Sequence, residues 1–197
     1  FEIDKLFFDE YFFSILSLLA SALTLVGIVF LRSFMAHNSI AKIVIILSLL
    51  SAFLFLPSIG MVYGFHLWTS SITGGLVDAK FIAIINTALE SPLGQVAMIP
   101  LLAWIAKNAP ENMKATFFAV FASFTNLALS ASALGSKYLN QIFVITREVK
   151  DKVTGNIVSS ADYSELGILM ISVALITLCI PIATIFIVQN SKYKSEE

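Results

Sequence analysis

Long stretches without a charged residue alternate with short charged segments along this chain. No Asp, Glu, Lys or Arg occurs in residues 11–31, 43–77, 115–136 or 166–191. A membrane crossing needs about 20 apolar residues at a rise of about 1.5 Å each, so each stretch is long enough to span a bilayer. A surface helix of a soluble protein would show a polar face at every turn, and these stretches do not. The pattern therefore predicts membrane-spanning helices.

Charged and turn residues divide the chain into five predicted spans, at residues 11–34, 40–64, 81–106, 113–140 and 165–190. We therefore expect an all-α polytopic bundle that forms a single membrane domain over residues 1–197. Residues 65–79 contain Trp68, which suits the membrane interface, and the helix-breaking pair Gly74 and Gly75, and they predict a loop with a short surface helix. Residues 144–163 alternate apolar and polar types, which predicts a small exposed hairpin outside the membrane.

The composition agrees with this pattern. The chain is 58% hydrophobic and 13% charged, whereas soluble proteins average about 25% charged residues. The net charge of −1 and the lack of a basic stripe argue against nucleic acid as a partner. The single cysteine, Cys179, lies in the last predicted span, so the chain has neither a disulfide framework nor Cys/His metal spacing. The lipid bilayer is therefore the first expected partner.

The sequence contains no motif that would support catalysis. A nucleophile next to a base, a glycine-rich phosphate loop and the spacing of a metal site are all missing. We expect no enzyme activity, no cofactor and no metal.

Glu90 is the residue of greatest chemical interest. It follows Phe81 by nine residues, which places it roughly 14 Å deep at 1.5 Å per residue, near the middle of the bilayer. A central charge costs roughly 2.5–3.5 kcal/mol, so this carboxyl group must face a cavity, find a partner or stay protonated. Glu90 is thus a candidate for substrate binding or proton coupling, and the alternative is that it pairs with a neighbouring helix.

Further candidates surround Glu90 in the third span. Asn86 lies four residues earlier and shares its helix face, and Gln95 is another polar residue of the same span. Pro92 and Pro100 lack an N–H group, so the span is expected to kink or unwind beside Glu90. Transporters place binding sites at broken helices of this kind, although membrane helices also tolerate prolines that have no role.

The fourth span presents a polar stripe opposite a row of phenylalanines. Ser123 and Asn126 belong to this stripe, together with Thr116 and Ser130. The stripe is either the lining of an aqueous cavity or a close-packing surface between helices. In the first span, small residues including Thr24 and Gly27 favour helix packing.

The segment from Ile99 to Leu139 resembles the late helices of the folate-biopterin transporter family within the major facilitator superfamily. The family pattern is a proline-bearing helix, an Ala-Pro turn and an Ala-Thr-x-Phe-Ala helix with Ser and Asn downstream. The matching residues here are Pro100, Ala109, Pro110, Ala115, Thr116, Phe118, Ala119, Ser123 and Asn126. The Glu90-Ser91-Pro92 sequence falls where the family usually has an acidic residue followed by Ser. The chain departs from the pattern at Lys114, where the family usually has Glu, and at Ala128, where it usually has Gly.

The resemblance implies the last five helices of a twelve-helix secondary transporter, which works by alternating access between two six-helix halves. It implies a small polar or anionic solute, with folates and pteridines as candidates, proton coupling, and a location in the plasma (inner) membrane. The chain begins with Phe1 rather than Met, and we expect it to start inside a longer protein whose remaining helices complete the bundle.

Two alternatives stay open at this point. The chain could be a facilitator for another polar solute, such as a peptide, because deep polar residues do not encode a substrate. It could also be a membrane subunit that transports nothing and packs within a larger complex, which would account for an odd number of helices.

Overall fold

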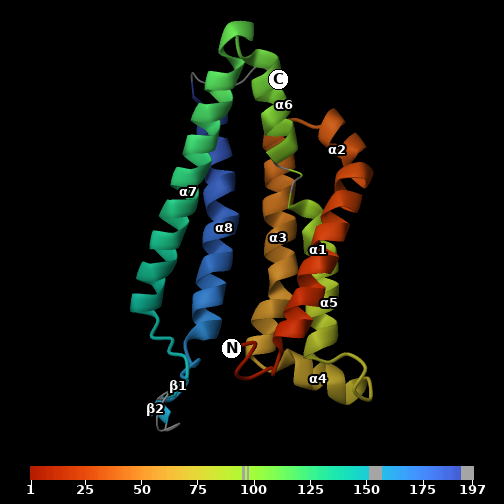
Figure 1. Cartoon of the computed structure of the whole chain (residues 1–197), viewed down its shortest axis with the longest axis vertical. Helices are drawn as coiled ribbons and strands as arrows, with labels where there is room; N and C mark the ends of the chain where they lie inside the picture. The colour runs from red at the N-terminus through yellow and green to blue at the C-terminus, as the bar shows by residue number, and fades with distance from the viewer. Residues whose placement is uncertain (95, 97, 151–156, 192–197) are drawn as a thin grey trace. The chain divides into compact units, whose positions relative to one another are not determined.

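The computed structural model describes residues 1–94, 96, 98–150 and 157–191. Eight α-helices occur in these residues (Figure 1): α1 Glu10–Phe30, α2 Arg32–His37, α3 Ile40–Val62, α4 Phe65–Ile72, α5 Ala79–Glu90, α6 Met98–Asn108, α7 Lys114–Ile142 and α8 Leu166–Gln189. Two short 3₁₀ helices, η1 Ser91–Leu93 and η2 Glu111–Met113, and two strands, β1 Val149–Lys150 and β2 Ile157–Ser159, complete the described elements.

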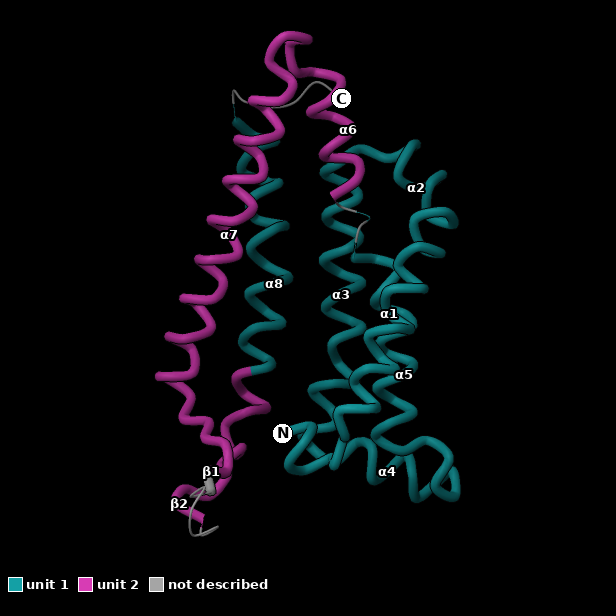
Figure 2. The backbone as a smooth tube through the Cα atoms, in the orientation of Figure 1, with its two compact units in different colours: residues 1–97, 170–197 teal, residues 98–169 magenta. Residues whose placement is uncertain are grey.

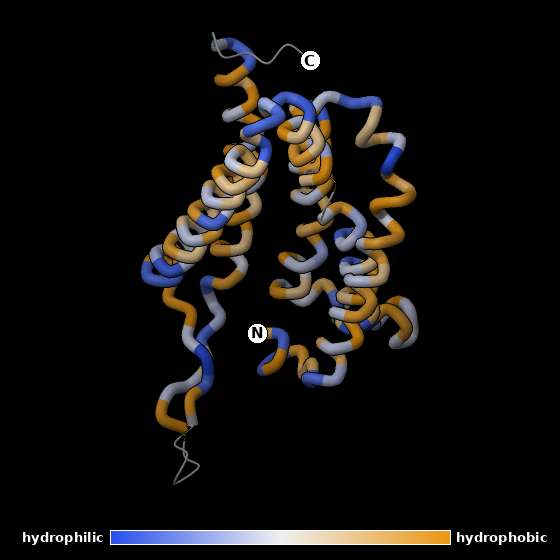
Figure 3. Tube along the Cα trace, turned by 45° about the horizontal axis from the view of Figure 1, so that its top comes forward, coloured by the Kyte–Doolittle hydropathy of each residue, from blue (hydrophilic) through white to orange (hydrophobic). Residues whose placement is uncertain are grey.

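The all-α fold class is confirmed. Within the described residues, five helical segments are long and apolar enough to cross a membrane: Glu10–Phe30, Ile40–Val62, Ala79–Asn108, Glu111–Ile142 and Leu166–Gln189. In Figure 3 hydrophobic positions predominate along the long helices, and hydrophilic positions gather mainly at the turns. Large apolar side chains such as Leu18, Phe30 and Phe124 are exposed, as expected where lipid takes the place of water.

The chain divides into two compact units, which Figure 2 distinguishes by colour. The first contains residues 1–97 and 170–197, and the second contains residues 98–169. Each is described by itself below, and the single membrane domain over residues 1–197 stays a prediction.

The core of the first unit lies where α1, α3 and α5 pack together. Its buried cluster consists of Phe8, Phe12, Met61, Ala79 and Ile82. The rings of Phe8 and Phe12 meet edge to face, with their centroids 4.8 Å apart, a favoured aromatic geometry. This cluster fixes the beginning of α1 against the beginning of α5.

Acidic residues begin both of these helices. The carboxylate of Asp9 accepts a hydrogen bond from the N–H of Phe12 (2.9 Å), and that of Asp78 accepts one from the N–H of Phe81 (2.8 Å). Each satisfies an N–H group that has no acceptor within its own helix, which stabilises the helix by roughly 1 kcal/mol. α1 and α5 therefore start at defined residues on either side of the cluster.

The second unit combines the packed pair α6 and α7 with a short antiparallel strand pair. β1 and β2 pair Val149 with Ser159, and an isolated bridge pairs Thr146 with Asp162. This pairing lies in the segment where the hairpin was predicted; its expected turn, residues 154–156, lies outside the described residues. Glu165 closes the base of the connector, because its carboxylate accepts a hydrogen bond from the N–H of Val144 (2.7 Å).

Candidate functional site

The third predicted span is interrupted at Glu90. α5 ends at Glu90, the 3₁₀ turn η1 follows over Ser91–Leu93, and α6 begins at Met98. Pro92 has no N–H group to donate to the carbonyl of Ala88, so the α-helical hydrogen-bond ladder stops here. The hydroxyl of Ser91 donates to the carbonyl of Thr87 and caps the end of α5. Glu90 is therefore the last residue of α5, and the chain continues as a 3₁₀ turn instead of an α-helix.

α1 packs against this interruption at two adjacent points. Thr24 Oγ1 lies 2.9 Å from the carbonyl oxygen of Ser91 and 2.8 Å from that of Ala20. One turn further along α1, Gly27 lies so close to Pro92 that a Cβ atom added to it would be 2.5 Å from Pro92 Cα. The two backbones are in direct contact at this position.

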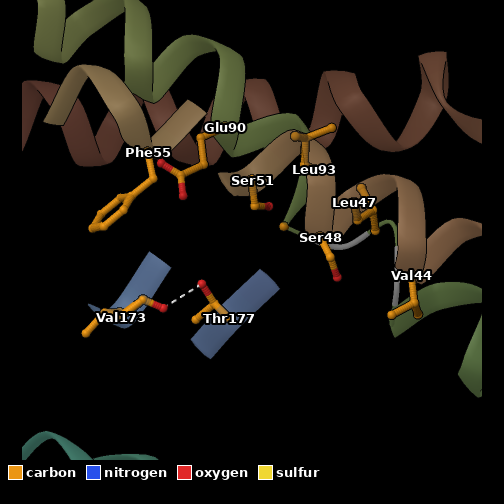
Figure 4. A pocket seen from close by; sticks show the side chains of 10 residues that line it. Val44, Leu47, Ser48, Ser51, Phe55, Glu90, Leu93, Val173 and Thr177 are labelled. Carbon is orange, nitrogen blue, oxygen red and sulfur yellow. Dashed lines mark hydrogen bonds between the residues drawn. The ribbon is translucent and has the colours of Figure 1, made fainter. Parts of the chain in front are cut away.

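Glu90 lines a cavity of about 500 Å³ in the first unit. Figure 4 shows its carboxylate directed into this space, with α3 side chains beside it and two α8 residues across from it. The lining residues are Val44, Leu47, Ser48, Ser51, Phe55, Glu90, Leu93, Gly94, Val173 and Thr177. The volume is within the range of about 300–1,000 Å³ that small-molecule sites occupy.

The polar groups of this cavity are one carboxylate and three hydroxyls. Within the described part of the chain, the only side-chain hydrogen bond of Glu90 comes from Asn86, whose Nδ2 lies 3.4 Å from Glu90 Oε2. Thr177 donates to the carbonyl of its own helix at Val173 (2.9 Å). The hydroxyls of Ser48 and Ser51, by contrast, form no hydrogen bond with any described residue. These two hydroxyls are available to a bound molecule.

Asn86 connects this cavity to a second one. It lines a largely apolar cavity of about 480 Å³ between α3 and α5, and its amide oxygen is buried there without a hydrogen-bond partner among the described residues. Its amide nitrogen points the other way, toward Glu90. An unsatisfied buried acceptor costs about 1–3 kcal/mol, and among the described residues no donor offsets this cost for the Asn86 amide oxygen.

The structure brings only some of the predicted site residues together. Asn86 and Glu90 are neighbours, and Pro92 and Pro100 lie on either side of the interruption. Pro100 lies in the first turn of α6, where the backbone N–H groups have no acceptor within the helix, so its missing N–H group breaks no helical hydrogen bond. Ser123 and Asn126 are exposed on α7 in the second unit, where Ser123 donates to the carbonyl of Ala119 (2.9 Å). Gln95 lies outside the described residues.

Several residues at this site were not among the predicted site residues. Ser48 and Ser51 are three residues apart in the second span, and this spacing places both on one helix face of an otherwise apolar run. Two hydroxyls on one face of an apolar span could have been identified from the sequence as candidate site residues. Thr24 and Gly27 were assigned to general helix packing, and no sequence pattern could show that their neighbour is the interruption after Glu90.

The arrangement suits hydrogen-bonded recognition rather than catalysis. A carboxylate accepts hydrogen bonds or takes up a proton, and each serine hydroxyl both donates and accepts. The surrounding leucine, valine and phenylalanine side chains supply apolar contact. Among the described residues, no three His, Cys, Asp or Glu side chains come together in a group that could hold a metal ion.

A helical membrane protein with an interrupted span and a carboxylate facing a cavity has the features of a transport protein. A model of the BT1 family matches residues 1–197. The chain therefore belongs to the BT1 family, the family of folate-biopterin transporters, and the resemblance noted in the sequence is confirmed. Membership supports a membrane transporter and is consistent with the expectation that the chain is not an enzyme. The comparisons with curated proteins and with solved structures gave no match.

Proposed function

We propose that this chain forms the C-terminal portion of a proton-coupled secondary transporter for folates or pteridines, with Glu90 as the coupling or binding group. The observation that carries the proposal is the Glu90 carboxylate at an interrupted span, directed into a cavity with two unbonded serine hydroxyls. Family membership supports the transporter class. The substrate and the coupling ion are parts of the proposal.

The chemistry of Glu90 supports proton coupling. A charge near the middle of a membrane costs roughly 2.5–3.5 kcal/mol unless it is neutralised. Asn86, at 3.4 Å, offers a weak neutral hydrogen bond and no countercharge. Uptake of a proton would remove this cost, and contact with N–H donors of a solute would lower it, so exchange between these two states couples the solute to the proton.

The same cavity suits a planar, hydrogen-bonding solute. Pteridine rings carry several N–H donors and ring-nitrogen acceptors, which complement a carboxylate and serine hydroxyls. Phe55 supplies an aromatic face in the same cavity on which a flat ring can stack. Ser48 and Ser51 would then fix the orientation of the ring.

In this proposal the five spans form part of the second half of a major facilitator fold, and helices outside this chain complete the bundle. Alternating access would expose the cavity to each side of the plasma membrane in turn. Ser123 and Asn126 on α7 would contribute another part of the pathway. Gln95 remains a candidate of the same kind.

Uptake of labelled folate and labelled biopterin by the full-length protein, measured across a pH series, tests this function. We expect Glu90→Gln to abolish the pH dependence and to lower uptake by about tenfold or more, since a central interaction with a charged group is removed. Glu111→Gln is the matched control, because Glu111 is an exposed carboxylate at the start of η2. Uptake by Glu90→Gln that equals wild type at every pH would overturn the role of Glu90.

The choice of substrate is tested separately from the coupling role. Ser51→Ala and Ser48→Ala should raise the KM for the true solute by about three- to tenfold through loss of a hydrogen bond, and should leave the pH dependence unchanged. Labelled peptides serve as the competing substrate class. Uptake of peptides without uptake of folate or biopterin would contradict the proposed solute, and a protein that moves none of them would favour a subunit that does not transport.

A further inference from the structure

The contact between α1 and the interrupted span involves the residues that directly follow Glu90. We propose that Thr24 and Gly27 are positioning residues for Glu90: they hold the η1 turn against α1 and thereby set where the carboxylate enters the cavity. This inference rests on the proposed function only in taking Glu90 as the functional group.

The interrupted span lacks the hydrogen bond that would normally keep its two parts in line. Because Pro92 has no N–H group, it cannot donate to the carbonyl of Ala88, and the turn that follows contains bonds from the N–H of Gly94 to the carbonyl of Ser91 (3.2 Å) and from the N–H of Val96 to the carbonyl of Leu93 (3.1 Å). Hydrogen bonds of this 3₁₀ type have poorer geometry than those of an α-helix, so an outside contact helps to fix the orientation of the turn. α1 provides that contact.

Thr24 supplies the polar part of this contact. Its hydroxyl hydrogen can be donated to the carbonyl of Ser91 (2.9 Å) or to that of Ala20 (2.8 Å). The bond to Ser91 joins segments 67 residues apart in the chain. The hydroxyl of Ser21, one turn earlier in α1, bonds to the carbonyl of Ser17 in its own helix (2.9 Å), and that of Thr184 likewise bonds within α8. The bond from Thr24 to another segment therefore sets it apart from these hydroxyls.

Gly27 supplies the close approach. A Cβ atom at this position would lie 2.5 Å from both Pro92 Cα and Pro92 Cβ, and 2.7 Å from the carbonyl oxygen of Pro92. These atoms belong to backbone and to a rigid ring, so they cannot move aside as a flexible side chain can. Only glycine allows α1 and η1 to lie this close, because it has no side chain.

Both residues act from outside the cavity. The lining contains side chains of α3, α8 and the segment that begins at Glu90, and it contains no residue of α1. Thr24 and Gly27 therefore touch the residues adjacent to Glu90 without reaching the space that would hold a solute. They can therefore affect transport only indirectly, by fixing the position of the interrupted segment.

Uptake kinetics of the full-length protein test this role, with Thr24→Val, Thr24→Ser and Gly27→Ala compared with wild type. Thr24→Val keeps the shape and removes the hydroxyl, and we expect KM to rise by about two- to tenfold with a shifted pH profile. Thr24→Ser should restore wild-type values. Thr184→Val and Gly135→Ala are matched controls, because the hydroxyl of Thr184 stays within α8 and an added Cβ at Gly135 meets nothing within 4 Å.

A second readout does not depend on transport. In a Cys179→Ser background, Glu90→Cys is labelled with a membrane-impermeant thiol reagent, and the labelling rate reports how the end of α5 faces the cavity. We expect Thr24→Val and Gly27→Ala each to change this rate by about threefold or more, while Thr24→Ser, Thr184→Val and Gly135→Ala leave it unchanged. Size-exclusion profiles in detergent show that each variant is folded, and Thr24→Ala replaces Thr24→Val should that variant fail this check.

The outcomes separate the two proposals. Wild-type uptake by Glu90→Gln at every pH overturns the role proposed for Glu90 in transport, whereas the labelling rates still decide whether α1 positions the interruption. Equal labelling rates and equal KM values in Thr24→Val, Gly27→Ala and their controls would overturn the positioning role. A Thr24→Ser variant as impaired as Thr24→Val would also overturn it, because the hydroxyl would then not be the group that matters.

Discussion

Four prolines lie within the predicted membrane spans; Pro100 lies in the first turn of α6, and the other three have different effects. α3 continues from Ile40 to Val62 through Pro57, and α8 continues from Leu166 to Gln189 through Pro181. At Pro92, by contrast, the α-helix has already ended at Glu90 and a 3₁₀ turn follows. A missing N–H group is common to all three sites, so it cannot by itself explain the interruption.

The surroundings of Pro92 account for the difference. A serine before it caps the end of α5, and Thr24 of α1 donates to the carbonyl of that serine. Gly27 allows α1 to lie directly against Pro92. In this chain α3 and α8 continue past their prolines, whereas α5 ends where a neighbouring helix satisfies a carbonyl of the following turn.

The largest effect is expected on the free energy of unfolding, from a substitution that weakens the packing of α1. Phe12→Ala removes a buried ring from the cluster that anchors α1, and we expect a loss of about 3 kcal/mol in the free energy of unfolding and a weakened contact at Pro92. Thermal and denaturant unfolding in detergent measure this loss. Phe124→Ala is the control, because its ring is 66% exposed; equal losses in both variants would contradict the anchoring role of the cluster.

Replacing Pro92 tests directly why α5 ends there while the helices that contain Pro57 and Pro181 continue. Pro92→Ala supplies an N–H group for the carbonyl of Ala88, so we expect α5 to extend, Glu90 to turn away and uptake to fall by about tenfold. Pro57→Ala and Pro181→Ala should change uptake by less than about twofold, because those helices are already continuous. Similar uptake in all three variants would show that the interruption has no role.

A smaller effect is expected at Asn86, which steadies the carboxylate from its own helix. Asn86→Ala removes the hydrogen bond to Glu90, and because pairs four residues apart contribute about 0.2–0.5 kcal/mol, KM should rise by about twofold. Asn108→Ala is the control, since among the described residues its amide bonds only to the carbonyl of Trp104 (2.8 Å). A larger change in the control than in Asn86→Ala would contradict this assignment.

The smallest effect concerns the connector between α7 and α8, far in sequence from Pro57 and Pro92. The backbone N–H of Ser164, and then its hydroxyl, donate to Asp162 and hold the pKa of this exposed carboxyl below its ordinary value of 3.8. A lowered folded-state pKa means that the ionised form favours the folded connector above the unfolded-state pKa, and that this contribution is lost as the pH falls through the folded-state pKa.

An NMR titration of the Asp162 carboxyl group should therefore show a midpoint below 3.8. Asp162→Asn should remove this titration and leave uptake at neutral pH unchanged, because the connector belongs to the second unit and contributes no described residue to the cavity lining. A midpoint at or above 3.8 would contradict the hydrogen bonds from Ser164 as the cause.

The four charge-free stretches, together with the largely apolar run 81–106 that contains Glu90, were sufficient to predict an all-α membrane protein with five spans. Hydropathy predicts this well because backbone groups in lipid must bond within their own segment, which leaves the helix as the solution for an apolar run of about 20 residues. The residues Glu90, Ser91 and Pro92 likewise indicated a break, since proline lacks the donor that a continuous helix needs.

Which helix meets that break, and which side chains share its cavity, was decided by the tertiary structure. Small residues in α1 indicated packing, but periodicity carries no information on the partner, so neither the bond from Thr24 to Ser91 nor the contact of Gly27 with Pro92 could be read from the sequence. Ser48 and Ser51 joined the site for the same reason: their positions along α3 fixed their face, and only packing decided that this face meets Glu90.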